Sequence, residues 1–327
     1  MSARSGKRAF SRKRASLLAR WVLPFVITSA ALAWVFSRVP FGRVLERTTA
    51  DALLLLIPAL LVFGAVALAI EARCLVRLLP SEHGRFGMWT AARVKAASYP
   101  LALIHYAIGA GGLAVLLRRR TGHTIGEATG IVALIALFDV GVQLLMMIAG
   151  VTLIGSALPA VRAGVATTTV ALIVAGFLVL RSPIGLGPLE RIRQLSVLAA
   201  ARTTPGARLL ELGLLRALFA LVFLGLIGVS LRAFEIDVPA LFLVASVPVL
   251  IVVAMIPSVA GLGTGQVAFV EVFRRYAEPE ALLACSLVLS TGLILLRASM
   301  GLAVAREYTR EALSAARGAD AGFEQTP

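Results

Sequence analysis

The chain has 327 residues, of which 59% are hydrophobic and only 15% are charged, and its formal net charge is +15. This composition, with a mean hydropathy of +0.92, excludes a soluble globular domain and indicates an all-α polytopic membrane protein. The basic residues cluster between apolar stretches, as in cytoplasmic loops, and no basic, aromatic-bearing soluble module is present, which argues against a nucleic-acid partner.

The first 20 residues are strongly basic, and they precede an apolar run at residues 21–37. The same order occurs in cleavable signal peptides. Because the basic stretch is long and many apolar segments follow, we predict an uncleaved first helix with a cytoplasmic amino terminus. Basic segments at this surface would also attract anionic lipid headgroups.

Apolar segments of about 20 residues, the length that spans a bilayer, recur along the first half of the chain. We expect membrane segments at residues 21–37, 52–70, 88–117 and 127–154. The third is unusual, because it contains charged residues, Pro100 and a cluster of glycines, and basic residues 118–120 follow it. If it crossed the membrane, these basic residues would face outward, against the positive-inside rule. We therefore predict a re-entrant hairpin that enters and leaves on the cytoplasmic side.

The second half of the chain repeats this pattern. Apolar segments are expected at residues 162–180, 209–231, 240–276 and 281–305, with a short interfacial helix in the basic loop between the first two. Residues 256–266 interrupt the third segment with a proline and three glycines. An unpaired backbone group in hydrocarbon costs several kcal/mol, so this break must lie inside protein or beside water. A second re-entrant hairpin here would leave the basic tail, residues 306–327, in the cytoplasm, where we expect it to be disordered.

Together these segments give about six spanning helices and two re-entrant broken hairpins in one transmembrane domain, residues 21–305. The elements of residues 21–155 recur in residues 162–305 with opposite orientation, which is an inverted-topology repeat. Many secondary transporters have this organisation and bind substrate near the midplane, where interrupted helices meet. We therefore expect the two breaks to approach each other, although fold analogy alone assigns no function.

The sequence Ile-Pro-Ser-Val-Ala-Gly-Leu-Gly-Thr-Gly-Gln at residues 256–266, followed by an apolar helix, carries a resemblance. It resembles the carboxy-terminal signature of the lysylphosphatidylglycerol synthase transmembrane-region family, also called flippase-like domain proteins. The segment order and Arg73, Asp139 and Arg297 add to the resemblance. It implies a protein concerned with lipid movement between leaflets, without the soluble aminoacyl-transfer domain found in better-known members.

Departures from that family concern its carboxylates. The first interruption has Gly109 and Gly112 in a stretch where the family has a Gly-Glu pair, and Gln266 stands where the family often has Glu. Residues 135–137 also lack the Glu-Arg pair often found upstream of Asp139. A neutral amide can hydrogen-bond a headgroup but carries no proton at physiological pH. The second interruption is therefore expected to form a neutral wall of a headgroup cavity.

Charged residues at membrane depth face protein or water, because a charge at the bilayer centre is costly. Asp139 and Arg297 lie in equivalent segments of the two proposed repeats, so we expect them to face a common interior, where they could form an ion pair. A purely structural bridge is the alternative. His105 could relay protons or bind phosphate, or it could be a packed, hydrogen-bonded residue. Arg93 and Lys95 could neutralise a lipid phosphate or simply anchor the topology.

The remaining candidates line or flank the two interruptions. Arg216 could point into the same interior, or it could reach the membrane surface together with Glu211. Glu271 is the acid nearest the second interruption and could replace the missing carboxylate. The glycines have close helix packing as their alternative role. The predicted substrate-binding set is Arg93, Lys95, His105, Gly109, Gly112, Asp139, Arg216, Ser258, Gly261, Gly263, Gln266, Glu271 and Arg297.

These features predict a lipid flippase-like transport protein of a bacterial-type plasma (inner) membrane, which moves an anionic phospholipid or a polyprenyl-phosphate lipid between leaflets. The alternatives are a nonenzymatic membrane partner of a cell-envelope glycosyltransferase and an integral-membrane lipid-headgroup enzyme. The sequence has no nucleophile-base pair at a recognisable spacing and no ATP-binding motif, and Cys74 and Cys285 have neither metal-ligand nor disulfide spacing. We therefore expect no cofactor or metal, and movement that is passive, driven by an ion gradient, or dependent on a partner.

Overall fold

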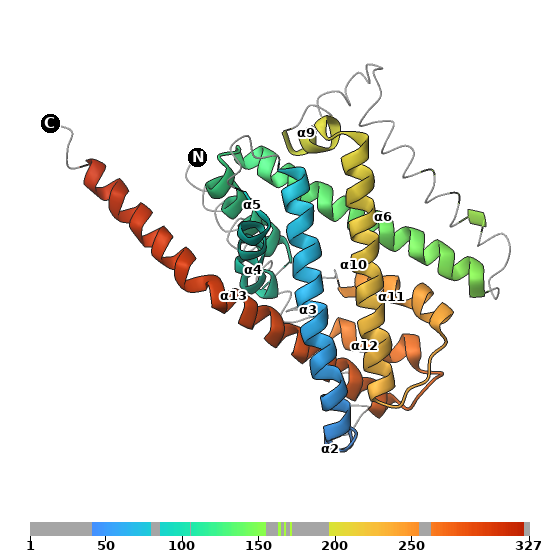
Figure 1. The fold of residues 1–327 in the computed structure, drawn as a ribbon. Helices are drawn as coiled ribbons and strands as arrows, with labels where there is room; N and C mark the ends of the chain where they lie inside the picture. The colour runs from blue at the N-terminus through green and yellow to red at the C-terminus, as the bar shows by residue number, and fades with distance from the viewer. Residues whose placement is uncertain are drawn as a thin grey trace, which may run out of the picture.

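The computed structural model describes residues 41–79, 86–104, 106–154, 163, 164, 167, 171, 196–254 and 263–323. Within these residues the chain is helical and has no strand, in agreement with the predicted all-α class (Figure 1). In this part of the chain four helices are long and apolar enough to cross a membrane: α3 (Ala50–Leu78), α6 (Ile125–Ile154), α10 (Gly206–Ala233) and α13 (Pro279–Phe323). The expected segments at 21–37 and 162–180 lie wholly or largely outside the described residues, so the total of six spans and the inverted repeat stay predictions.

Helix α3 extends further than the sequence predicts. It begins where the Thr49 side chain caps the backbone N–H of Ala52 at 3.2 Å, which satisfies one of the unpaired donors of the first turn. The prediction ended this membrane segment at residue 70, but Arg73 and Arg77 lie within α3. Their Nε atoms lie 3.6 and 2.6 Å from Glu211 of α10. These ion pairs hold the last turns of α3 against α10.

The expected first hairpin is formed by two helices, α4 (Met88–Ile104) and α5 (Tyr106–Thr121), which pack against each other. The sequence prediction placed the interruption at the glycines 109, 111 and 112. This placement is wrong, since all three glycines lie within α5. A Cβ atom on Gly109 would lie only 2.4 Å from the Cβ of Ala102. The glycine therefore permits α5 to approach α4 closely, which is the packing role that small residues have between membrane helices.

The second half contains the separate helices α11 (Ala240–Ala254) and α12 (Thr264–Phe273), on either side of residues 255–262, which lie outside the described residues. Helix α11 packs against α6, and α12 packs against α13. Two short helices, α2 (Phe41–Glu46) and α9 (Ser196–Thr203), flank α3 and α10 in sequence. The carboxyl part of α13 projects from the other labelled helices in Figure 1 and stays helical to Phe323, through most of the tail for which disorder is expected.

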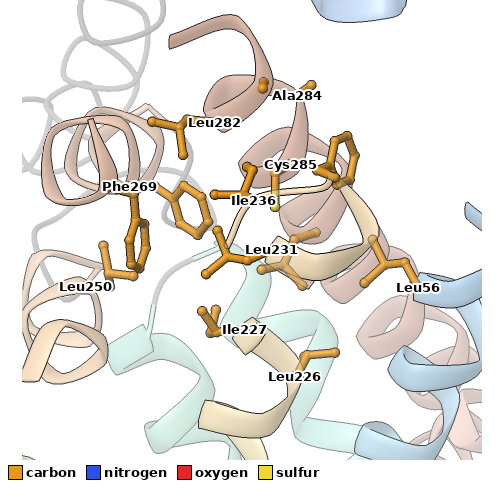
Figure 2. Packing of buried hydrophobic residues seen from close by; sticks show 14 of the residues in the cluster. Leu56, Leu226, Ile227, Leu231, Ile236, Leu250, Phe269, Leu282, Ala284 and Cys285 are labelled. Carbon is orange, nitrogen blue, oxygen red and sulfur yellow. The ribbon is translucent and has the colours of Figure 1, made fainter. Parts of the chain in front are cut away.

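Helices α3 and α10 lie side by side and carry two buried apolar clusters (Figures 1 and 2). One cluster includes Leu56, Leu231 and Phe269, from the amino half of α3, the carboxyl half of α10 and α12. The other, at the opposite end of the two helices, includes Leu75 and Leu117. In hydrocarbon such contacts stabilise helices by close packing rather than by escape from water. The clusters therefore fix the helix positions on either side of the polar residues described next.

Candidate functional site

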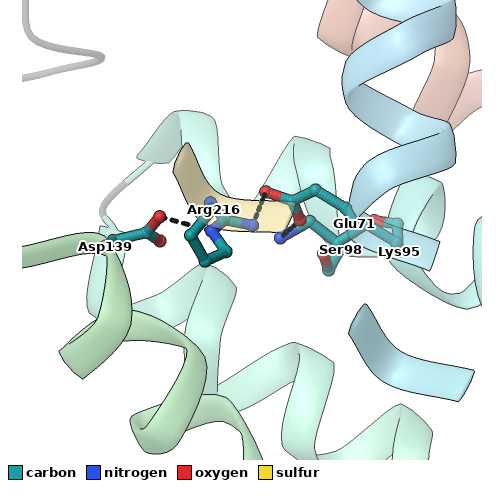
Figure 3. A network of polar contacts seen from close by, with 5 residues as sticks. All are labelled: Glu71, Lys95, Ser98, Asp139 and Arg216. Carbon is teal, nitrogen blue, oxygen red and sulfur yellow. Dashed lines mark hydrogen bonds and ion pairs between the residues drawn. The ribbon is translucent and has the colours of Figure 1, made fainter. Parts of the chain in front are cut away.

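Four charged side chains from four helices meet inside the bundle (Figure 3). Arg216 of α10 donates from Nε to Oδ1 of Asp139 on α6 at 2.5 Å, and from Nη1 to Oε1 of Glu71 on α3 at 3.5 Å. The Nζ atom of Lys95 on α4 pairs with the other carboxylate oxygen of Glu71. These four residues, which we call the charge network, connect α4 to α3, α10 and α6.

The charge network is largely enclosed by protein. The side chain of Arg216 is 2% exposed, that of Glu71 13% and that of Lys95 19%. Removing an ion from water costs several kcal/mol, so a buried charge is stable only with well-placed partners. With two acids and two bases the network is electrically balanced. The loss of any member would leave a buried charge without its counter-ion.

Helix geometry sets the depth of the network. Glu71 lies seven residues before the end of α3 and Lys95 seven residues after the start of α4, which places each about 10 Å along its helix. Arg216 lies ten residues after the start of α10, or about 15 Å. The carboxyl end of α3 and the amino end of α10 lie at the same end of the bundle (Figure 1). The network is therefore inside the apolar layer but nearer to this end than to the other.

Arg216 is the fixed centre of the network. Its guanidinium lies 4.5 Å from the ring centroid of Phe219, a cation–π contact, in addition to its two carboxylate partners. A planar guanidinium holds several acceptors in a defined geometry, whereas a lysine ammonium is a point charge on a flexible stem. Lys95 contacts only Glu71 within the network. It is thus the member best suited to exchange one anionic partner for another.

A small cavity adjoins the network between α3, α4, α10 and α13. Its volume is about 40 Å³, and its polar lining residues are Glu71, Tyr99 and Arg297. A buried water needs roughly 10–15 Å³ of such space, so the cavity has room for a few waters and not for a lipid headgroup. Separation of these helices would be needed to admit one. Arg297 gives this cavity a positive charge beyond those that balance within the network.

The expected pairing of Asp139 with Arg297 is not formed. Asp139 bonds to Arg216, while Arg297 lines the cavity on the side of Glu71 and makes no hydrogen bond or close ion pair within the described residues. The reason is the helix order, because α6 packs against α10 whereas α13 packs against α3 and α4. Arg93 is half-buried on α4, and because it lies two residues before Lys95 its side chain projects in a different direction.

The predicted glycine positions serve the packing of the first hairpin. Gly109 faces Ala102, and a Cβ on Gly112 would lie 2.3 Å from the Leu101 side chain. A Cβ on Gly111 would meet nothing within 4 Å. The two close glycines therefore fix the distance between α4 and α5, and so the position of Lys95. His105 lies outside the described residues.

The second interruption is neutral where it is described. Gln266 is fully buried, accepts a hydrogen bond at Oε1 from the N–H of Gly263 at 2.5 Å, and donates from Nε2 to Ser290 Oγ at 3.2 Å. Gly263 has φ +84°, a conformation that favours glycine. Gln266 thus joins the start of α12 to α13. Glu271 is exposed and pairs with Arg274 at 3.3 Å, away from the charge network.

Ser258 and Gly261 lie outside the described residues. So do the residues between α4 and α5 and between α11 and α12, which are residue 105 and residues 255–262. The expected approach of the two interruptions therefore stays a prediction. What the structure brings together is Lys95, Asp139 and Arg216 of the predicted set, with Arg297 beside them and Gln266 and Glu271 elsewhere.

Two residues of this region were not singled out from the sequence. Glu71 follows Ile70, at which the predicted segment ends, so it lies outside the expected membrane segments. An acid flanking an apolar run was nevertheless a usable signal, because the chain has only 17 acids against 32 bases. Gln143, one turn after Asp139 on α6, is 7% exposed, and among the described residues its Oε1 has no hydrogen-bond partner.

The polar groups described here suit the binding of an anion rather than a metal. Within the described residues no three His, Cys, Asp or Glu side chains lie close enough to hold a metal ion. Basic groups at the network and the cavity could bind a phosphate through charge-assisted hydrogen bonds. Comparison of the chain with protein-family models and with curated proteins gives no match.

Proposed function

We propose that this protein moves a lipid with an anionic phosphate headgroup, a phospholipid or a polyprenyl phosphate, between the leaflets of a bacterial-type plasma (inner) membrane. The observation that carries the proposal is the charge network, enclosed among helices that are long and apolar enough to span a bilayer. Ionisable residues at such depth commonly belong to substrate or ion pathways. The adjoining positive charge of Arg297 favours an anionic ligand.

The distribution of charge supports an orientation in which the network faces the cytoplasm. Basic residues predominate at the network end of the bundle: Arg73, Arg77, Arg93, Arg118, Arg119, Arg120, Arg202 and Arg208 accompany Glu127 and Glu211. At the opposite end acids are more frequent: Glu46, Asp51, Glu235, Asp237, Glu271, Glu278 and Glu280 accompany Arg47, Arg232, Arg274 and Arg275. By the positive-inside rule, this distribution favours a cytoplasmic location for the network end. The amino end of α4 and the carboxyl end of α5 would then also face the cytoplasm.

In the proposed mechanism the headgroup approaches from the cytoplasmic leaflet. Its phosphate replaces Glu71 as the partner of Lys95, while Arg216 keeps Asp139 and its own position. Arg297 neutralises the remaining phosphate charge. Because the cavity holds only a few waters, α4 and α5 separate from α3 and α13 to admit the headgroup. This step uses no ATP, and the inverted repeat would supply an equivalent opening toward the other leaflet.

Reconstitution tests the proposal directly. Purified protein is placed in phosphatidylcholine liposomes with a trace of tail-labelled fluorescent phosphatidylglycerol, and the fraction of label accessible to an external quencher is followed with time. Loss of the protected inner-leaflet signal in protein-containing vesicles, at a rate proportional to protein content, is expected. Chemical conversion of the headgroup would favour a lipid enzyme instead. Neither movement nor conversion would favour a nonenzymatic partner of an envelope glycosyltransferase.

A further inference from the structure

The second polar feature of α6 is Gln143, which the proposed mechanism does not use. The residue is 7% exposed, its Oε1 is enclosed, and it makes no hydrogen bond within the described residues. Buried polar atoms are nearly always paired with protein or with a bound group. An acceptor left unpaired in a membrane-embedded interior therefore points to a donor that comes from a ligand.

The position of Gln143 connects it to the charge network. It lies four residues after Asp139, so the two side chains project from nearly the same face of α6, one turn apart. Seven residues further along the same face, a Cβ on Gly150 would lie 2.2 Å from the Cα of Ala245 on α11. Gln143 thus lies on the stripe of α6 that leads from the charge network to α11. Helix α11 ends at Ala254, next to the second interruption.

The chemistry of the free group selects its partner. An amide oxygen accepts hydrogen bonds and cannot bind a phosphate oxygen, which is also an acceptor. The group that reaches this enclosed oxygen must therefore carry a donor, although the Nε2 atom of the same amide can donate to an acceptor. An ammonium would add positive charge beside a network whose acids are already paired, whereas a hydroxyl would donate without adding charge.

We propose that Gln143 is a specificity-determining residue that accepts a hydrogen bond from a hydroxyl of the transported headgroup. This inference rests on the proposed function and adds a substrate class to it: anionic phospholipids whose headgroup bears hydroxyls.

The test compares two lipids of equal charge. Tail-labelled phosphatidylglycerol has headgroup hydroxyls, and tail-labelled phosphatidylethanol has none; each is followed in the same phosphatidylcholine liposomes. We expect the wild type to move phosphatidylglycerol about three- to tenfold faster, the effect of one net hydrogen bond. Gln143→Leu should lower the phosphatidylglycerol rate to that of phosphatidylethanol and leave the latter unchanged.

Controls separate this effect from misfolding. Leu145→Ala changes an exposed residue of α6 and should keep the preference. Gln143→Leu removes an unpaired acceptor and should unfold at or above the wild-type temperature. Equal wild-type rates for the two lipids, or a preference that survives Gln143→Leu, would overturn the inference and leave the proposed function standing. Faster movement of phosphatidylethanolamine than of phosphatidylglycerol would also overturn it. Movement of none of these lipids would overturn it too and would reject the phospholipid form of the proposed function.

Discussion

The two interrupted segments of this protein differ in what holds them. The first, α4–α5, is attached to α3 by an ion pair between Lys95 and Glu71, which continues to Arg216. The second, α11–α12, is attached to α13 by the neutral hydrogen bonds of Gln266. An ion pair can exchange one partner for a charged ligand, whereas the neutral, fully buried amide of Gln266 carries no charge to attract one. We therefore assign ligand handling to the first segment and a structural role to the described part of the second.

Aromatic packing strengthens this contrast. In the second segment Phe269 and Phe273 lie 4.8 Å apart between ring centroids, and Phe242 of α11 lies 5.0 Å from Tyr276. Such pairs contribute about 0.5–1.5 kcal/mol each beyond their burial. The first segment has close glycine contacts between its two helices, and it buries aliphatic residues such as Val94 and Leu117 in the second apolar cluster. Both segments are thus packed against apolar neighbours, and they differ in the ion pair of the first and the aromatic pairs of the second.

The largest effect is expected when the centre of the network is removed. Arg216→Gln leaves the carboxylates of Asp139 and Glu71 with one cationic partner between them. Breaking a buried ion pair from one side typically costs 3–5 kcal/mol. We expect a loss of this order in the free energy of unfolding, measured by denaturant titration in detergent, and a complete loss of lipid movement. A variant as stable as the wild type would show that the network does not hold the helices together.

A matched pair of glycine variants tests the packing of the first hairpin. Gly109→Ala places a Cβ 2.6 Å from the backbone Cα of Ala102 and should destabilise the protein by about 1–3 kcal/mol, as overpacking does. Gly111→Ala meets nothing within 4 Å and should be neutral or stabilising by up to about 1 kcal/mol, because alanine favours helix. Thermal unfolding of both proteins checks the difference. Equal effects would mean that α5 does not approach α4 as closely as described.

In the second segment we expect a smaller loss that is confined to stability. Gln266→Leu leaves the N–H of Gly263 and the hydroxyl of Ser290 without their partner. A buried donor without its acceptor costs about 1–3 kcal/mol. The unfolding temperature should fall. An unchanged temperature would indicate that the hydrogen bonds of Gln266 contribute little to the attachment of α12.

The smallest effect is expected at the exposed end of the second segment. Arg274 and Glu271 form an ion pair between side chains that are largely solvent-accessible, and such pairs contribute about 0–1 kcal/mol. Arg274→Gln should change the unfolding free energy by less than about 0.5 kcal/mol and leave lipid movement unchanged. It serves as a control for charge removal, and a marked effect would mean that Glu271 has a role of its own.

Apolar length was sufficient to locate α6 and α10, because hydrophobicity over about 20 residues is a local property of the sequence. The end of α3 was missed because its last turns bury Leu75 and Leu78 against other helices, and Arg73 and Arg77 pair with Glu211, 134 residues from Arg77. The glycines of α5 signalled an irregular region but not whether the helix breaks or packs closely. That choice depends on the neighbouring helix.

The pairing of charges was the least predictable part of the site. Asp139 and Arg297 were matched by their equivalent places in a proposed repeat, yet the actual partner, Arg216, is set by which helices are neighbours. Gln266 was expected in a cavity wall, and its hydrogen bonds to Gly263 and Ser290 follow from the local fold of α12 and its contact with α13. Rotation and order of helices are properties of the assembled bundle and are not encoded in spacing alone.

The most direct test of the contrast between the two segments is the rate of phosphatidylglycerol movement per folded protein in Lys95→Gln and Gln266→Leu. We predict that Lys95→Gln lowers this rate at least tenfold, corresponding to about 1.4 kcal/mol, because the phosphate loses the group that exchanges partners. Gln266→Leu should stay within about twofold of the wild type once the folded fraction is counted, since the lost hydrogen bonds of about 1–3 kcal/mol act on stability. Equal losses in the two variants, or a larger loss in Gln266→Leu, would contradict the account.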